Sequence, residues 1–377
     1  MTNVSMKRGL LICTVLLFIV QGVAAADVTR SPFTDFLLKP GLFGVGVTTV
    51  PLVDTTRGTP ATLTCAALPT RTLTTEVWYP TQDPSLMEAR DALPAKSLIG
   101  FPLIVHAHGI TSDRLEFSYV AAHLASHGYV VAAPDFPLTN GASIATCQPS
   151  AAVISADVAS QAGDVIFVSQ ALVSPLIKAI APTLPKIDSN RTGLSGYSLG
   201  GTTAILASYY SPTIKAVALS APETCALFGA GILPAAALTK PSIILQGTTD
   251  IVVHLDNNAQ PLFEANAEPK YLVSIENGSH GGFIAKAPLI EAAYPGYAID
   301  TIICNLLKAY WGGPCDTCVP PYLLSPQMLS SRQHDLTKAG HLAFFNGYLR
   351  SSLLDRVFLK YIMDYENADV DVTYADH

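Results

Sequence analysis

The segment Gly196-Tyr197-Ser198-Leu199-Gly200 decides the fold, because it fits the pattern G-x-S-x-G and lies between a predicted strand and a predicted helix. A serine in this pattern sits on a sharp, strained turn, where a side chain on either flanking residue would clash with the neighbouring strand or helix. We therefore expect Gly196 and Gly200 to form a tight turn that presents Ser198 as a nucleophile, once a base has taken its proton. The alternative is a loop rich in glycine and serine without catalytic consequence.

Strands alternate with helices on both sides of this turn. Several strands are continuously apolar, which is typical of a parallel sheet covered by helices on both faces. The expected class is therefore α/β, with a mostly parallel central sheet, an antiparallel edge at residues 45–53 and 72–79, and active-site residues at the carboxyl ends of the parallel strands. The other strands are expected at residues 102–106, 129–133, 191–196, 214–219, 241–246 and 270–275, and the helices at 114–127, 153–173, 199–210 and near 336–362.

Local signals predict where some elements begin and end. Asp113, followed three residues later by Glu116, resembles a capping box at the start of the helix expected at 114–127, and Gly128 fits its C-terminal cap. The polar, acidic segment 367–377 is expected to be a frayed end.

A base and an orienting acid are expected after Ser198, because in this kind of fold the order along the chain is serine, acid, histidine. Asp250 follows the strand predicted to end at Gln246, and His280 follows the strand predicted to end at Ile275 on a glycine-rich loop. His280 would take the proton of Ser198, while Asp250 would hold the imidazole in the required tautomer and stabilise its protonated form.

Other acids and histidines compete for these roles less well. Asp256 is the alternative acid, although it is better placed as a helix N-cap. Four histidines precede the serine, which makes them poor bases in this chain order. Three later histidines are expected on the surface or on helices. The early histidines are His106, His108, His123 and His127, and the later ones are His254, His334 and His341.

Acyl transfer also requires backbone donors for the oxyanion. The N–H of Leu199, directly after the serine, is expected to supply one. The second is expected from Ile110, since the segment His106-Ala107-His108-Gly109-Ile110 resembles an oxyanion loop in which Gly109 lets the backbone turn. His108 either braces this loop or is a hydrogen-bonded, half-buried histidine.

The N-terminus has the pattern of a secretory signal peptide. Lys7 and Arg8 precede an apolar run at 9–20 and the small residues 24–26. Cleavage is expected after Ala26, leaving residues 27–377 as one domain, secreted or periplasmic. A membrane anchor is the alternative, but the run is shorter than the roughly 20 residues that span a bilayer. No later segment is expected to be long and uncharged enough to span one.

Charge and composition exclude several classes of protein. The chain has 377 residues, of which 49% are hydrophobic and 14% charged, so it is not intrinsically disordered. Removal of the leader takes two basic residues and no acidic one, which changes the net charge from −7 to −9. An acidic chain of this kind argues against a nucleic-acid partner.

The cysteines point to an oxidising compartment. Loss of Cys13 with the leader leaves six, and an even number in an exported chain indicates disulfides of undetermined connectivity. Cys315 and Cys318 are expected to form a local disulfide. A redox or zinc motif is the alternative, although no second cysteine pair accompanies them.

The sequence resembles the α/β-hydrolase superfamily, and within it the secreted esterases similar to platelet-activating-factor acetylhydrolases and dienelactone hydrolases. The resemblance covers about residues 41–283 and a final helix, and implies a serine carboxylic-ester hydrolase without metal or cofactor. It implies ordinary short or medium acyl esters, of small molecules or lipids, because the nucleophile is serine and not the cysteine of dienelactone hydrolases. Polyester hydrolases are also similar, but Thr202 stands where their elbow continues with glycine. The resemblance rests on Val45-Gly46-Val47 with Asp54 and Arg57, Glu76-Val77-Trp78-Tyr79-Pro80, Ala107-His108-Gly109, the segment 124–129, the segment 196–201, and the loops of Asp250 and His280.

Residues 284–335 are too long for a simple connection to the final helix. They are expected either to form a lid or acyl-pocket wall, or to pack onto the main core. Beyond a hydrolase, the sequence leaves open a polyester hydrolase or an acyltransferase using the same triad, and a noncatalytic binding protein. The intact set of Ser198, Asp250 and His280 counts against the last. Oligomeric state is not predicted.

Overall fold

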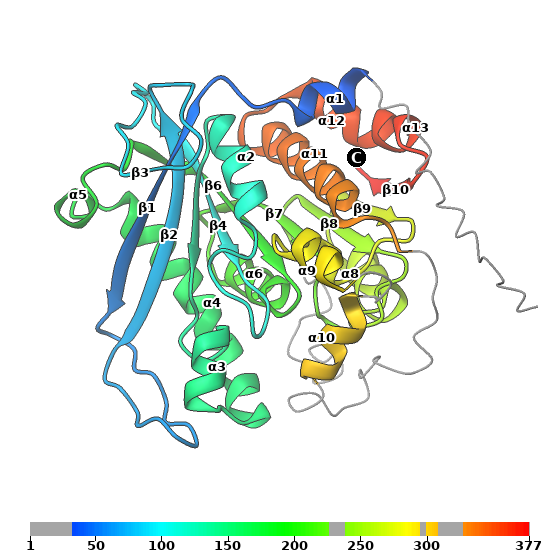
Figure 1. Cartoon of the computed structure of the whole chain (residues 1–377). Coiled ribbons are helices and arrows are strands. Elements are labelled where there is room, and N and C mark those ends of the chain that lie inside the picture. The colour runs from blue at the N-terminus through cyan, green and yellow to red at the C-terminus, as the bar shows by residue number, and fades with distance from the viewer. Residues whose placement is uncertain (1–31, 226–237, 295–298, 308–326, 377) are drawn as a thin grey trace, which may run out of the picture.

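The computed structural model describes residues 32–225, 238–294, 299–307 and 327–376. Its strands form one sheet in the order β10-β9-β8-β7-β6-β4-β5-β2-β1-β3, in which β9 through β5 are parallel to one another (Figure 1). The sheet confirms the α/β-hydrolase fold class. The strands are β1 (Gly44–Asp54), β2 (Arg71–Thr81), β3 (Ala89–Arg90), β4 (Phe101–Ala107), β5 (Val130–Pro134), β6 (Ile187–Tyr197), β7 (Ile214–Ser220), β8 (Ser242–Gly247), β9 (Lys270–Ile275) and β10 (Val370–Ala375).

Helices cover both faces of the sheet. One hydrophobic core includes buried residues of α4, α6 and α8, and the other includes buried residues of α2 and α11. The central strands are buried along their whole length, which explains their continuous apolar pattern. The helices are α1 (Pro32–Leu38), α2 (Ser118–Ser126), α3 (Gly141–Cys147), α4 (Ala151–Val173), α5 (Ile177–Ile180), α6 (Leu199–Tyr210), η1 (Leu255–Asn257), α8 (Ala259–Ala265), η2 (Gly281–Phe283), α9 (Ala287–Ala293), α10 (Ile299–Leu307), α11 (Ser330–Leu349), α12 (Leu353–Val357), the π-helical η3 (Phe358–Ile362) and α13 (Met363–Glu366).

The predicted antiparallel edge is confirmed. β1 and β2 pair antiparallel over their full length, and β2 pairs antiparallel with β5. From Thr49 to Asp54, exposed and buried residues of β1 alternate, as in a strand with one solvated face.

Helix α4 is the described helix that is long and apolar enough to cross a membrane, with 44% of its apolar window buried inside the fold. By this measure the expectation that no later segment qualifies is wrong. Two of its carboxylates, Asp157 and Asp164, accept hydrogen bonds from the guanidinium of Arg71, and all three side chains are buried. The hydrogen bonds satisfy charges that would otherwise be costly to bury.

Some predicted helix ends differ from the structure. Helix α2 begins at Ser118, without a side-chain cap, so the capping box of Asp113 and Glu116 does not form. The final helix begins at Ser330, and a π-helical turn and two short helices follow its end at Leu349.

The C-terminal segment is not a frayed end. Its residues form β10, which pairs antiparallel with β9. Val370 and Val372 are buried while Asp371 and Thr373 are exposed, so the period-two pattern of a half-buried strand overrides the polar composition.

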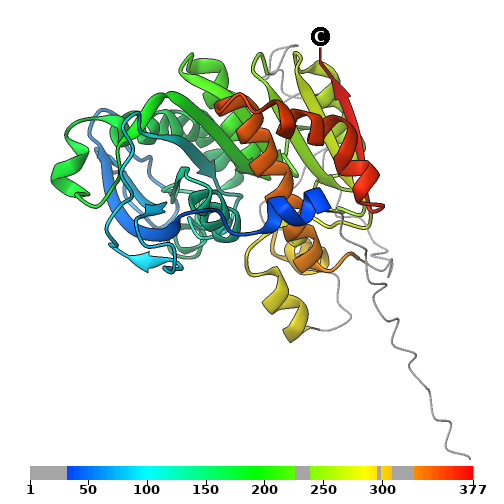
Figure 2. The same ribbon diagram turned by 90° about the horizontal axis from the view of Figure 1, so that it is seen from above.

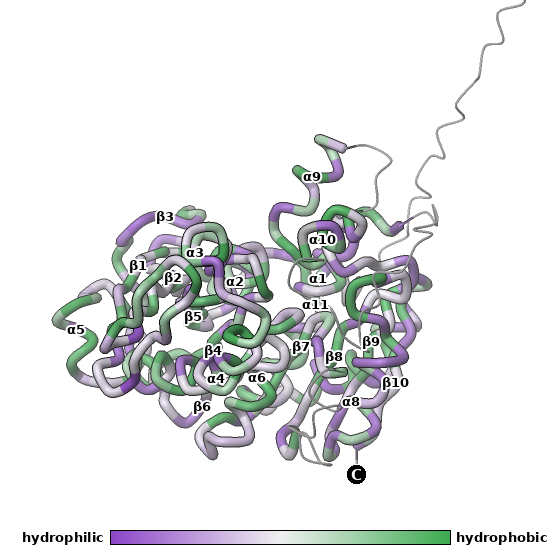
Figure 3. The backbone as a smooth tube through the Cα atoms, turned by 90° about the horizontal axis from the view of Figure 1, so that it is seen from below, coloured by the Kyte–Doolittle hydropathy of each residue, from purple (hydrophilic) through white to green (hydrophobic). Residues whose placement is uncertain are grey.

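The two ends of the described chain meet on one face. Helix α1 lies beside α11 near α12, as both views show (Figures 1 and 2). The hydroxyl of Thr34 donates to Glu366 at 2.9 Å. Helix α9, by contrast, projects from the body of the protein (Figure 3).

A disulfide joins Cys65, in the loop between β1 and β2, to Cys147 at the end of α3, 82 residues later. Cys225 and Cys304 are also disulfide-bonded. Such bonds are typical of exported proteins. The predicted signal peptide, with Cys13, and the predicted bond between Cys315 and Cys318 lie outside the described residues.

Candidate active site

Three strand ends bring Ser198, Asp250 and His280 together. Ser198 directly follows β6, Asp250 lies in the loop after β8, and His280 lies in the loop after β9. These strands are parallel and near neighbours in the sheet, so their carboxyl ends open onto the same edge. The residues therefore meet although up to 82 positions separate them in the chain.

The turn at Ser198 is strained, as predicted. Ser198 has φ 53° and ψ −125°, a backbone conformation that a residue with a side chain rarely adopts. A Cβ atom on Gly196 would lie 2.3 Å from the carbonyl oxygen of Gly200, and one on Gly200 would lie 2.0 Å from the carbonyl oxygen of Ala107. Neither position therefore has room for a side chain, and Gly200 lets the start of α6 approach the end of β4.

A continuous chain of hydrogen bonds links the three side chains. The Nε2 atom of His280 lies 3.1 Å from Oγ of Ser198, and its Nδ1 atom lies 2.8 Å from Oδ2 of Asp250. All three residues are buried. This geometry suits a neutral imidazole whose Nδ1–H donates to the carboxylate, which leaves Nε2 to accept the serine proton.

Asp250 is fixed by its own loop. Its Oδ1 atom accepts the backbone N–H groups of Val252 and Val253 at 2.9 and 2.7 Å, and its Oδ2 atom also accepts from Gln246 at 2.9 Å. Burial lowers the pKa of His280, but the charge and the hydrogen bond of Asp250 raise it, and the net pKa lies above its ordinary value. The carboxylate thus favours the imidazolium that forms when the serine is deprotonated.

The predicted oxyanion donors come from two segments next to the serine. Leu199 is the first residue of α6, and Ile110 is in the loop after β4. A Cβ atom on Gly109 would lie 3.2 Å from Cβ of Ser198, so this loop passes close to the nucleophile. Within the described part of the chain, neither the Ile110 nor the Leu199 amide donates to another group.

The oxyanion loop turns at a different residue from the one expected. Gly109 does not have a positive φ, whereas Thr111 does, at 65°. Gly109 is needed for the close approach to the serine. His108 is fully buried, with Nδ1 2.7 Å from the Gly109 carbonyl oxygen and Nε2 accepting from the Phe136 amide at 3.0 Å. It therefore braces the loop.

Two buried carboxylates, Glu116 and Asp300, were not assigned to the site by the sequence analysis. Glu116 accepts the Gly109 amide, and Asp300 accepts the amides of His280 and Gly281. Glu116 is hidden in the sequence by its resemblance to a helix cap. The signal for Asp300 is a single carboxylate at the start of the apolar segment 299–303.

The structure gives the alternative residues other positions or other hydrogen-bond partners. Asp256 is in η1 and is not its N-cap, a position that His254 occupies. His334 contacts the Ile284 carbonyl oxygen at 3.0 Å, and His341 contacts the Thr337 carbonyl oxygen at 3.0 Å.

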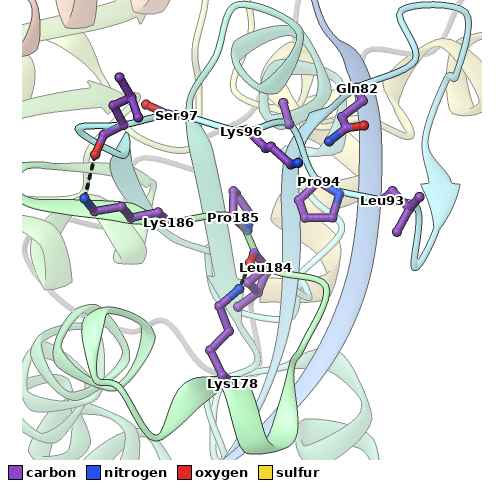
Figure 4. Close-up of a pocket in the computed structure, with 11 residues that line it drawn as sticks. Gln82, Leu93, Pro94, Lys96, Ser97, Lys178, Leu184, Pro185 and Lys186 are labelled. Carbon is purple, nitrogen blue, oxygen red and sulfur yellow. Dashed lines mark hydrogen bonds between the residues drawn. The ribbon is translucent and has the colours of Figure 1, made fainter.

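Within the described residues, neither a metal site nor the pocket drawn in Figure 4 competes with this site. In the described ranges, no group of three or more His, Cys, Asp or Glu side chains is arranged to hold a metal ion. A pocket of about 730 Å³ lies at the amino ends of β4 and β6, the opposite edge of the sheet (Figure 4). Two of its lysines, Lys178 and Lys186, donate to backbone carbonyls of the chain itself.

Comparison with known proteins agrees with this geometry. The model of the PET hydrolase-like family matches residues 92–290, more than half of the 377-residue chain. Among solved structures, a ferulic acid esterase from Streptomyces cinnamoneus is similar, with a TM-score of 0.62 and 20% identity over 89% of this chain and 97% of that one. At this identity the likeness concerns the fold. No curated protein matches the chain in sequence.

The family match includes the segment of the nucleophile elbow, in which Thr202 follows Gly201. Thr202, which stands where the elbow of polyester hydrolases continues with glycine, is buried in α6 with its hydroxyl donating to the Glu223 carbonyl. The elbow therefore accommodates it. The narrower resemblance to platelet-activating-factor acetylhydrolases and dienelactone hydrolases stays a prediction. Since the family model spans more than half of the sequence, the chain belongs to the PET hydrolase-like family and is an α/β-hydrolase serine esterase that acts on carboxylic esters.

Proposed function

We propose that the chain is an exported carboxylic-ester hydrolase in which Ser198, His280 and Asp250 form the catalytic triad and an acyl-enzyme is the intermediate. The observation that carries the proposal is the hydrogen-bond chain from Ser198 Oγ through His280 to Asp250, at 3.1 and 2.8 Å. It joins a nucleophile, a base and an orienting acid at one edge of the sheet.

The first half of the reaction forms the acyl-enzyme. Ser198 Oγ attacks the ester carbonyl while His280 Nε2 takes its proton, and the N–H groups of Ile110 and Leu199 donate to the oxyanion. The proton on His280 then passes to the departing alkoxide, which leaves as the alcohol.

The second half releases the acid. His280, neutral again, takes a proton from a water molecule that attacks the acyl group on Ser198. Collapse of this second oxyanion returns the proton from His280 to Ser198 and frees the carboxylic acid. The chain needs no cofactor for these steps, because its own side chains supply every proton transfer.

Short to medium acyl esters of small molecules or lipids are the proposed substrates. A polyester is the second candidate, and the match to the PET hydrolase-like family favours it. Such a polymer carries the same ester bond, so the triad chemistry is unchanged and the difference lies in access to the serine.

Initial rates on p-nitrophenyl esters from acetate to palmitate, together with acid release from a polyester film, test the proposal. Ser198→Ala is the matched control. Turnover that peaks at short acyl groups and disappears in the variant supports the first substrate class, and film hydrolysis supports the second. Product diverted from acid to a new ester when an alcohol is added would indicate an acyltransferase. Turnover that persists in the variant would contradict the triad.

We also propose that residues 1–26 are a cleaved signal peptide and that residues 27–377 form a single catalytic domain. The disulfide between Cys65 and Cys147 supports export, and the one continuous sheet supports a single domain. Mass spectrometry of the protein exported with its own leader should find Asp27 at the N-terminus. An intact leader in the exported protein would favour the membrane anchor.

A further inference from the structure

Asp300, the second residue of α10, connects the two loops that carry the acid and the base. Its Oδ2 atom accepts the backbone N–H of His280 at 2.9 Å and that of Ile251 at 3.3 Å, and its Oδ1 atom accepts that of Gly281 at 2.7 Å. Ile251 directly follows Asp250. One carboxylate thus holds the backbone of both loops, and its side chain is fully buried.

Several charged or titratable groups face His280 from different elements. Asp250 comes from the loop after β8, Asp300 from α10, and Glu116 from the loop after β4, and each of their charges raises the pKa of His280. Tyr197, at the end of β6, donates its hydroxyl to the His280 carbonyl oxygen at 3.1 Å. Asp300 is therefore one of three acids that favour the protonated imidazole.

We propose that Asp300 is a positioning residue for the reaction, which holds the Asp250 and His280 loops in register and adds negative charge beside the imidazole. The inference rests on the proposed triad. It also assigns a role to the segment 284–335, whose helix α10 would act as a support for the catalytic loops.

The carboxylate of Asp300 indicates a role beyond the packing of the two loops. Burial, and then the nearby charge of Asp250, raise the pKa of Asp300 to about 6, so its ionised form is disfavoured where it stands. An asparagine would still offer one oxygen to the loop amides without this repulsion. A carboxylate in this position accepts all three N–H groups and supplies charge, which an amide does not.

The test compares Asp300→Asn and Asp300→Ala by kcat/KM for p-nitrophenyl acetate between pH 5 and 9. Asp157→Asn is the matched control, because Asp157 is also a buried, hydrogen-bonded carboxylate but pairs with Arg71, away from the triad. We expect Asp300→Asn to lower kcat/KM about 10- to 100-fold with KM nearly unchanged. Asp300→Ala should lower it further, since no oxygen then accepts the loop amides.

The pH profile separates positioning from stability. Loss of a negative charge lowers the pKa of His280, so the acid limb of kcat/KM should move to lower pH in Asp300→Asn. In Asp157→Asn the melting temperature should fall while the acid limb stays in place. If Asp300→Asn loses stability but keeps the wild-type kcat and acid limb, Asp300 is only structural.

Two further measurements keep the inference testable. Wild-type protein that fails to react with a fluorophosphonate contradicts the triad itself, whereas equal labelling rates of wild type and Asp300→Asn contradict only the role of Asp300. If Asp300→Asn does not fold, Asp300→Glu keeps the charge but moves the carboxylate by one methylene group, so kcat/KM should fall while the acid limb stays in place. An unchanged kcat/KM in Asp300→Glu would overturn the positioning role.

Discussion

Gly109 donates its backbone N–H to both carboxylate oxygens of Glu116, at 3.1 and 3.2 Å. The next residue, Ile110, is the proposed oxyanion donor, so a buried acid fixes the loop that presents it. Glu116 also lies 3.4 Å from Nε2 of His106, and burial raises its pKa to about 7. The oxyanion loop therefore depends on a group that titrates close to neutral pH.

Glu116→Gln should change the acid limb of kcat/KM. As pH falls through about 7, Glu116 gains a proton and its hold on Gly109 weakens. This adds to the separate loss of activity that follows when His280 is protonated. We expect the slope of log kcat/KM against pH to approach two in the wild type and one in the variant. Rates on p-nitrophenyl acetate measure this, and equal slopes would show that Glu116 does not titrate in the active protein.

Glu116→Gln should also change how the stability of the protein depends on pH. The pKa of Glu116 is higher in the folded than in the unfolded chain, so its stabilising contribution is present below the unfolded value and is lost as pH rises through about 7. The shift corresponds to on the order of 3 kcal/mol. Urea unfolding should show that the free energy of unfolding of Glu116→Gln rises relative to that of the wild type as the pH is raised from 5 to 9. A difference that is constant with pH would contradict the shift.

Ser198→Gly should be more stable than Ser198→Ala, although both should be inactive and unreactive toward fluorophosphonates. The positive φ of 53° strains alanine but suits glycine, and strain of this kind costs about 1–3 kcal/mol. The free energies of unfolding of the two variants give the difference directly. Equal values would mean that the turn relaxes once the serine is gone.

Gly200→Ala should disrupt the active-site edge, whereas Gly340→Ala, also in a helix, should not. The new Cβ at position 200 would meet the backbone carbonyl of Ala107 at 2.0 Å, but at position 340 it would meet a methyl group of Leu245 at 3.1 Å. We expect the free energy of unfolding to fall by about 3 kcal/mol or more in Gly200→Ala and to change by no more than about 1 kcal/mol in Gly340→Ala. Thermal melts and esterase rates check both.

The disulfides predict a protein without free thiols. Mature protein unfolded without reductant should give no reaction with a thiol reagent, and six reactive thiols would contradict an exported, oxidised chain. Replacing Cys65 and Cys147 by serine should lower the free energy of unfolding by about 2–5 kcal/mol, because the bond closes a loop of about 82 residues.

The central sheet and the Ser198 turn could be predicted from the sequence because their signals are local. Apolar strands, glycine positions and loops after strand ends depend on residues near one another in the chain. The same rule placed Asp250 and His280 at adjacent strand ends, where the structure brings them within hydrogen-bonding distance.

The supporting groups could not be predicted because their partners are distant or their local pattern misleads. Asp300 acts on the amide of His280, 20 residues away, from a helix whose position the sequence does not indicate. Glu116 stands three residues after Asp113, the spacing of a helix cap, while its hydrogen bonds go to Gly109. The segment of β10 is polar in composition, and its alternation of buried and exposed residues is only six residues long, so the sequence indicated a frayed end and not a strand.

The last strand of the chain sets a condition on how the enzyme is made. β10 is the outermost strand and covers the open side of β9, the strand that leads to His280. Until residues 370–375 have been synthesised and released, this edge offers unpaired backbone groups to other chains. The sheet is therefore complete only once residues 370–375 have paired with β9. Chains that lack residues 370–375 should therefore aggregate more readily than the full-length protein.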